Sequence, residues 1–142
     1  MSSNLFDMTN KVALITGSSK GIGRAIAEEM VRQGAKVVIS SRKADVCQEV
    51  ADAINAEAKA SGNQTGEAIV IPAHVGQREA LQHLVDETRA RLGQIDVLVC
   101  NAAVNPFYGS MQELPDDAMD KILDINIKSN HWLVNMLSLI HI

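Results

Sequence analysis

Aromatic side chains are scarce in this chain, at 3% of 142 residues, and proline and cysteine are scarce too. With so few aromatic rings, the chain offers little surface on which nucleic-acid bases could stack. Its net charge of −4 also leaves no excess of basic residues to bind the phosphate backbone of a nucleic acid. We therefore expect no nucleic-acid partner. No run approaches the ~18 consecutive apolar residues of a membrane-spanning helix, so we expect no membrane partner either.

The two cysteines, Cys47 and Cys100, are too few for a disulfide framework and do not form a C-x-x-C pair. They are interpreted as free thiols in a reducing compartment. The first ten residues carry neither the basic nor the apolar region of a secretory signal, so we predict a cytoplasmic protein. The four histidines lack the i, i+4 spacing of a zinc-binding helix, and no metal site is expected.

Short apolar runs alternate with amphipathic stretches along the chain, and this order predicts an α/β fold. Continuous apolar runs are typical of strands buried on both faces, and alternating strands and helices connect into a parallel sheet. The predicted strands are 12–16, 37–39, 68–71 and 97–100. The predicted helices are 21–33, 44–60, 78–92 and 115–139, the last one kinked near Asn126.

A glycine-rich segment, Thr16–Gly23, joins the first predicted strand to the first predicted helix. Gly17 allows a sharp turn, Gly21 lets the backbone approach a pyrophosphate, and Gly23 lets the helix pack closely on the sheet. Free N–H groups and the helix dipole then hold the phosphates. The sequence therefore predicts a dinucleotide site; the alternative is a tight turn without a ligand.

The end of the second predicted strand indicates which dinucleotide binds. An acid about 20 positions after the glycines would bind the ribose 2′-hydroxyl of NAD, and none is present there. Ser41 and Arg42 stand in its place, and the planar guanidinium suits a 2′-phosphate. Lys20 adds a second positive charge. These residues favour NADP(H); the alternative is that Arg42 and Lys43 are only the solvated start of the next helix.

Over residues 10–134 the chain resembles classical members of the short-chain dehydrogenase/reductase family. The resemblance rests on the spacing T-G-x-x-x-G-I-G, on Asn101–Ala103, which is similar to the family's N-A-G motif, and on Asp124–Ile127. The stretch 101–110 resembles the branch of NADP-dependent carbonyl and retinal reductases. The implied fold is a doubly wound Rossmann sheet. Residues 1–142 would form its N-terminal part, one incomplete NADP-binding domain with about four strands and helices on both faces.

The resemblance also implies roles for single residues. Asn126 corresponds to a catalytic asparagine that holds a proton-relay water by bending its helix; the alternative is an ordinary polar residue of a helix. His74 stands where an acid usually bonds the adenine, and Val75 follows it. The candidate cofactor-binding residues, including those of the glycine loop, are Gly17, Ser19, Lys20, Gly21, Ile22, Gly23, Ser41, Arg42, Lys43, His74, Val75, Asn101, Ala102 and Ala103.

The family's catalytic pair, a tyrosine with a lysine four residues later, is absent from this sequence. The tyrosine would act as general acid/base, and the lysine would lower its pKa. The single tyrosine is Tyr108, in a loop that could at best border a substrate mouth, and the fourth residue after it is Gln112. We therefore expect a chain interrupted by a frameshift, a premature stop or partial expression. The alternatives are a natural half-domain and a split enzyme.

An interruption here would leave the fourth strand as an open sheet edge and would expose part of the last helix and the apolar tail 137–142. Both defects favour self-association, so we expect a homo-oligomer. Two functions remain open. In one, the intact protein is an NADP(H)-dependent oxidoreductase acting on a small carbonyl or alcohol, and this chain binds cofactor without catalysis. In the other, the chain is a non-catalytic NADP-binding or assembly module.

Overall fold

Four parallel strands form the centre of the computed structural model, which describes residues 4–141 and the side chains of residues 4–138. Leu14 of the first strand pairs with Val38 on one side and with Leu98 on the other. The predicted α/β fold and parallel sheet are confirmed, and the strand ends differ by no more than one residue. The strands are β1 (Val12–Thr16), β2 (Lys36–Ser40), β3 (Glu67–Val70) and β4 (Val97–Val99), in the order β3-β2-β1-β4.

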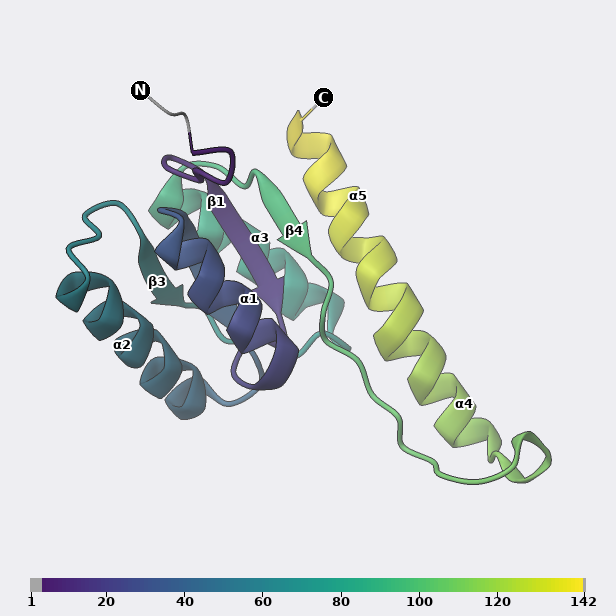
Figure 1. Ribbon diagram of the computed structural model, residues 1–142. Helices are drawn as coiled ribbons and strands as arrows, with labels where there is room; N and C mark the ends of the chain where they lie inside the picture. The colour runs from purple at the N-terminus through teal and green to yellow at the C-terminus, as the bar shows by residue number, and fades with distance from the viewer. Residues whose placement is uncertain (1–3, 142) are drawn as a thin grey trace.

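Helices connect the strands and lie on both faces of the sheet (Figure 1). Gly34 and Gly93, with φ of +98° and +83°, follow the first and third helices in the left-handed conformation that ends a helix. At Asn126, where a kink is predicted, the structure has a π-helical segment within one long helical stretch, and the kink itself stays a prediction. The helices are α1 (Gly21–Arg32), α2 (Ala44–Ala60), α3 (Arg78–Leu92) and α4 (Asp116–Leu123), followed by the π-helical segment (Asp124–Lys128) and α5 (Ser129–His141).

Alternate residues of the central strands belong to two separate hydrophobic clusters. Ala13 and Ile15 of β1 pack with buried residues of α1 and α2. Leu14 of β1 and Val38 of β2 pack with buried residues of α3 and α5. Because helices cover both faces, the inner residues of these strands need apolar side chains whichever face they point to. This accounts for the continuous apolar runs in the sequence.

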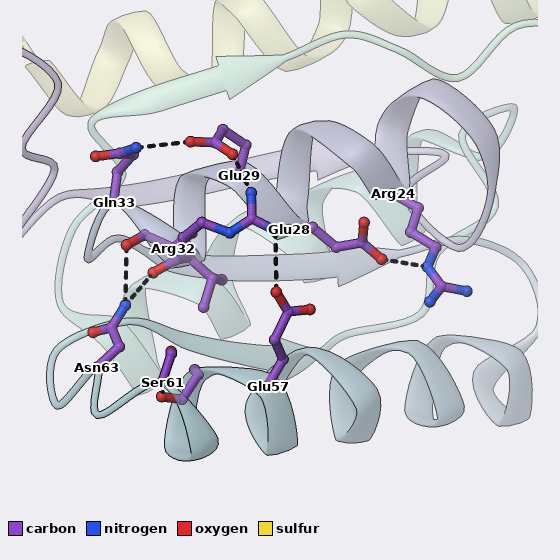
Figure 2. A network of polar contacts seen from close by, with 10 residues as sticks. Arg24, Glu28, Glu29, Arg32, Gln33, Glu57, Ser61 and Asn63 are labelled. Atoms are coloured by element: carbon purple, nitrogen blue, oxygen red, sulfur yellow. Dashed lines mark hydrogen bonds and ion pairs between the residues drawn. The ribbon is translucent and has the colours of Figure 1, made fainter.

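Polar side chains fasten α1 to α2 and to the loop that follows α2 (Figure 2). Arg32 pairs with Glu29 of its own helix, and its Nη2 donates to Glu57 Oε1 of α2 at 3.1 Å. Asn63 Nδ2 donates to the Val31 carbonyl at 2.7 Å. Hydrogen bonds to Glu57 and Glu29 raise the pKa of the Arg32 guanidinium. Both ion pairs of Arg32 are solvent-exposed, so each contributes little to stability. The pair with Glu57 joins α1 to α2.

The fourth strand lies at an edge of the sheet, as predicted. Leu123 and Ile127 expose large apolar side chains on the long helical stretch, whereas Leu137 is buried with the α3 cluster. The predicted exposure of the tail is therefore wrong for Leu137, and the side chains of residues 139–142 lie outside the described part. Self-association stays a prediction. Within residues 4–141, no helix is long and apolar enough to cross a membrane.

Candidate dinucleotide-binding site

A cavity of about 510 Å³ lies beyond the carboxyl ends of the strands. Its walls come from the loops after all four strands and from one side of the α4–α5 stretch. In parallel α/β sheets, ligands bind at this edge. The lining residues are Gly17, Ser19, Lys20, Gly21, Ile22, Arg42, Ala73, His74, Val75, Asn101, Ala102, Ala103, Val104, Lys121 and Ile125.

Most of the predicted cofactor-binding residues line this cavity, but Gly23, Ser41 and Lys43 do not. Gly23 is buried behind the loop, against the side chain of Asn101. The Ser41 hydroxyl lies 3.1 Å from the buried Cys47 thiol of α2, so it is engaged on the side of that helix. Lys43 is the exposed residue that precedes α2. The binding roles of the whole set stay predictions.

The glycine loop has the geometry of a phosphate cradle. Gly17 and Gly21 have φ of +66° and +57°, which glycine adopts at little cost. A Cβ on Gly17 would lie 3.0 Å from Ala102 Cα, so only glycine allows the two loops to approach this closely. Lys20 precedes α1 without a side-chain cap, which leaves backbone N–H groups of the first helical turn available to an anion.

Hydrogen bonds hold the loop after β4 against the glycine loop. Asn101 Nδ2 donates to the carbonyls of Thr16 and Gly17, both at 3.0 Å. The Thr16 hydroxyl accepts from the N–H groups of Asn101 and Ala102, both at 3.1 Å. Both walls of the cavity are therefore fixed before any ligand arrives, which reduces the entropic cost of binding.

Three cations and no carboxylate line the cavity: Lys20, Arg42 and Lys121. Within the described residues, none of the three forms an ion pair, whereas Arg24 and Lys128 outside the cavity do. The cavity is therefore electropositive and suits a ligand with several negative charges.

Sequence reasoning missed the α4–α5 wall, which is formed by Lys121 and Ile125. Both precede Asn126, and because they are four residues apart on a helical stretch they share one face of it. This spacing is the sequence signal from which the wall could have been predicted. Ala73 and Val104 were also missed, and each neighbours a residue that was predicted.

Asn126 lies in the π-helical segment, and its side chain does not line the cavity. Its amide is bonded to the backbone of Val104, through Val104 N–H to Oδ1 at 2.8 Å and Nδ2 to the Val104 carbonyl at 2.9 Å. Its own carbonyl accepts from Asn130 Nδ2 at 2.9 Å. Tyr108, by contrast, is fully exposed and is not part of the cavity wall.

Comparison with known proteins agrees with this geometry. Residues 11–139 match the family model described as short chain dehydrogenase. The chain belongs to this family. Among short-chain dehydrogenases, the Bos taurus Dehydrogenase/reductase SDR family member 4 is 42% identical over 126 residues, which cover 89% of this chain and 43% of that protein. The human Dehydrogenase/reductase SDR family member 2, mitochondrial, is 42% identical over 130 residues, 92% of this chain and 44% of that protein.

Solved structures of short-chain dehydrogenases have the same architecture. A short-chain type dehydrogenase/reductase from Mycobacterium marinum superposes with a TM-score of 0.83 at 32% identity, over 95% of this chain and 50% of that one. A metagenomic short-chain oxidoreductase in complex with NADP gives a TM-score of 0.82 at 28% identity, over 94% of this chain and 57% of that one. The chain spans about half the length of the relatives it matches.

Proposed function

We propose that this short-chain dehydrogenase chain binds NADP(H) and forms the cofactor-binding part of an oxidoreductase that acts on a carbonyl or alcohol. The observation that carries the proposal is the cavity with Lys20, Arg42 and Lys121 and without a carboxylate. NADP(H) has one phosphate more than NAD(H), and a third cation without an acid favours the more negative ligand. A related metagenomic structure contains NADP, which supports the same choice.

The cradle fits two parts of the cofactor, the diphosphate and the 2′-phosphate. The uncapped N-terminal turn of α1 and the close approach at Gly17 accommodate a diphosphate. Arg42, directly beyond β2, and Lys20, directly before α1, would hold the 2′-phosphate. When bound, NADP(H) supplies or accepts the hydride. The Asn126 carbonyl, with Asn130 on one lone pair, would hold a water that passes a proton.

A calorimetric titration of the 142-residue chain with NADPH and with NADH tests the proposal. An extra charge-assisted hydrogen bond to the 2′-phosphate is worth about 1.5–3 kcal/mol, so NADPH should bind at least about tenfold more tightly than NADH. Equal affinity would refute the NADP(H) preference. Failure of both to bind would refute the proposed function.

The competing hypothesis is a non-catalytic NADP-binding or assembly module. It is favoured by the absence of a Tyr-x-x-x-Lys sequence from this chain. NADPH consumption by the 142-residue chain on a panel of carbonyl compounds separates the two. Turnover would exclude the module, whereas binding without turnover is expected from the module and from an oxidoreductase that needs further residues. Addition of a polypeptide that carries a Tyr-x-x-x-Lys pair from a related short-chain dehydrogenase would then produce turnover only for the oxidoreductase.

A further inference from the structure

Two large apolar side chains are exposed in the loop that precedes β1. Leu5 is 88% exposed and Phe6 is 69% exposed. They are the central residues of a turn, which the N–H of Asp7 closes by donating to the carbonyl of Asn4 at 3.0 Å. Glycine, proline, asparagine, aspartate and serine are the usual residues at the centre of a turn. The geometry of the turn therefore does not account for a leucine and a phenylalanine at these positions.

Hydrogen bonds hold this turn against the end of α1. The N–H of Phe6 donates to Asn4 Oδ1 at 3.1 Å, and Asn4 Nδ2 donates to Gln33 Oε1 at 3.1 Å. The N–H of Met8 donates to the carbonyl of Gln33 at 2.9 Å. A structured loop thus presents Leu5 and Phe6 to solvent, so they need little further ordering when a partner binds.

Beside the turn lies a second cavity, of about 530 Å³. Its apolar lining consists of Leu5, Phe6, Met8 and Met30. Both methionines are partly buried against the core, and their flexible thioether side chains adapt readily to different partners. The loop leads into the amino end of β1, whereas the dinucleotide site lies beyond the carboxyl ends of the strands (Figure 1). The two cavities share no lining residue.

The charged groups that line the second cavity are the carboxylates of Asp7 and Glu29. Hydrogen bonds from Thr9 lower the pKa of Asp7, and a hydrogen bond from Gln33 lowers the pKa of Glu29 (Figure 2). Both carboxylates are therefore ionised at neutral pH. Arg32 pairs with Glu29 from outside the cavity, whereas Asp7 forms no ion pair with any of residues 4–138. The cavity thus has an uncompensated negative charge.

This charge indicates which kind of partner fits the apolar patch. In a two-fold dimer the same patch lies on both sides of the interface, so a second copy would bring acids towards acids. A basic group beside an apolar side chain complements both properties of the cavity, the apolar lining and the carboxylate of Asp7.

We propose that the second cavity docks a short peptide segment of a partner protein, in which an aromatic or aliphatic side chain stands beside a lysine or arginine. The apolar side chain packs against Phe6 and Met30, and the basic group pairs with Asp7. Docking at this end of the sheet is separate from the dinucleotide site and does not depend on the proposed function.

Random dodecapeptides displayed on phage are the probe, selected on the immobilised 142-residue chain. The enriched peptides should combine apolar side chains with lysine or arginine. The most enriched peptide is then synthesised, and its affinity is measured by fluorescence anisotropy. Phe6→Ser should weaken its binding by about tenfold or more, because an apolar contact is lost. The control Tyr108→Ser, at a fully exposed position outside the cavity, should leave the affinity within about twofold.

A second variant tests the charge without altering the apolar patch. Asp7→Asn keeps an oxygen that accepts from the N–H of Thr9, at 2.9 Å in the wild type, and removes the negative charge. It should weaken peptide binding by about two- to fivefold at low salt and have no effect at high salt. The control Asp120→Asn, at an exposed position of α4, should have no effect. Circular dichroism and the melting temperature establish that each variant is folded.

The remaining outcomes overturn the proposal. A selection without enrichment, or enriched peptides that lack either the apolar or the basic residues, shows that the cavity does not recognise this chemistry. Equal binding to the wild type and to Phe6→Ser places the peptide elsewhere. If sedimentation velocity finds a dimer that Phe6→Ser dissociates, the cavity is an interface between copies of this chain. NADPH titration is independent of all these results, so failure of this proposal and failure of the proposed function are distinguishable.

Discussion

The side-chain amide of Asn126 makes two hydrogen bonds to the backbone of Val104. Its Oδ1 accepts from the Val104 N–H at 2.8 Å, and its Nδ2 donates to the Val104 carbonyl at 2.9 Å. One amide thereby fastens the loop after β4 to the π-helical segment. Since Val104 lines the cavity, this pair sets the position of one wall.

Asn126→Leu should lower the free energy of unfolding by about 1–3 kcal/mol, because it leaves the partly buried N–H and carbonyl of Val104 without partners. Urea denaturation measures this. The free energy of unfolding of Asn126→Asp should lie between those of the wild type and Asn126→Leu. A carboxylate still accepts from the Val104 N–H but cannot donate to the Val104 carbonyl. The control Asn135→Leu, at an exposed position of α5, should change stability by less than about 0.5 kcal/mol. An equal effect of both leucine variants would contradict the role of the pair.

The fold could be predicted from the sequence because each element carries its own local signal. The four apolar residues of β1, Val12 to Ile15, require burial on both faces, and Gly34 and Gly93 mark the helix ends with positive φ. The glycine loop was predictable for the same reason, since its strand and helix flank it directly. These signals lie within a few residues of the feature they indicate.

The rest of the site depends on tertiary packing that no local pattern contains. Lys121 reaches the cavity only because the long helix crosses the strand ends, more than a hundred residues after the glycine loop begins. Ser41 is predicted to face the cofactor, yet its hydroxyl lies beside Cys47, because side chains alternate at the end of β2 and the next helix begins there. The Nδ1 atom of His74 accepts from the N–H of Gly76, and no sequence pattern predicts this contact.

Gly23→Ala should destabilise the chain by about 1–3 kcal/mol and weaken NADPH binding. The added Cβ would lie 2.5 Å from Asn101 Nδ2 and 2.6 Å from the Gly17 carbonyl, so it would separate the two loops that form the cradle. Urea denaturation and calorimetry measure the two effects. Gly62→Ala is the control, because Gly62 has a φ of +76° and no atom lies within 4 Å of the new Cβ. Backbone strain alone should lower the free energy of unfolding of this variant by about 1–2 kcal/mol. Its NADPH affinity should stay unchanged. Unchanged NADPH affinity in Gly23→Ala would contradict this account.

Lys121→Gln should weaken the binding of NADPH and of NADH alike, by about two- to fivefold at low salt. This factor corresponds to one exposed charge pair. Both cofactors carry the diphosphate, so the cation on α4 acts on both. The effect should shrink as salt rises. Lys128→Gln removes the same charge from the adjoining π-helical segment, where the ammonium pairs with Asp124, and should leave both affinities unchanged. Equal effects of the two variants would show that net charge alone is responsible.

The two thiols should differ in reactivity. Cys47 is fully buried, whereas Cys100 is exposed at the end of β4, and partial desolvation raises the pKa of its thiol. A raised pKa means less thiolate at a given pH, so reaction with an aromatic disulfide should be slower than for a free thiol at pH 8. The midpoint of its pH–rate profile should lie above the ordinary value near ~8.5. Cys100→Ser should abolish the native reaction. Two reacting thiols in the folded chain, or a lower midpoint, would contradict the prediction.

Arg42→Glu should remove the preference for NADPH over NADH. The variant loses the partner of the 2′-phosphate and places a carboxylate beside it, so NADPH affinity should fall by at least about tenfold, the value of a charge-assisted hydrogen bond. NADH has a 2′-hydroxyl that can donate to the new carboxylate, so its affinity should stay within about threefold of the wild type. Competitive titrations with both cofactors at one salt concentration measure the ratio. Arg78→Glu, an equal charge reversal at the start of α3 outside the cavity, should leave that ratio unchanged. NADPH and NADH differ only at the 2′-position of the adenosine ribose, so only a residue beside that position can discriminate between them. Equal losses of affinity for both cofactors in Arg42→Glu would therefore show that the adenosine end does not lie beside Arg42.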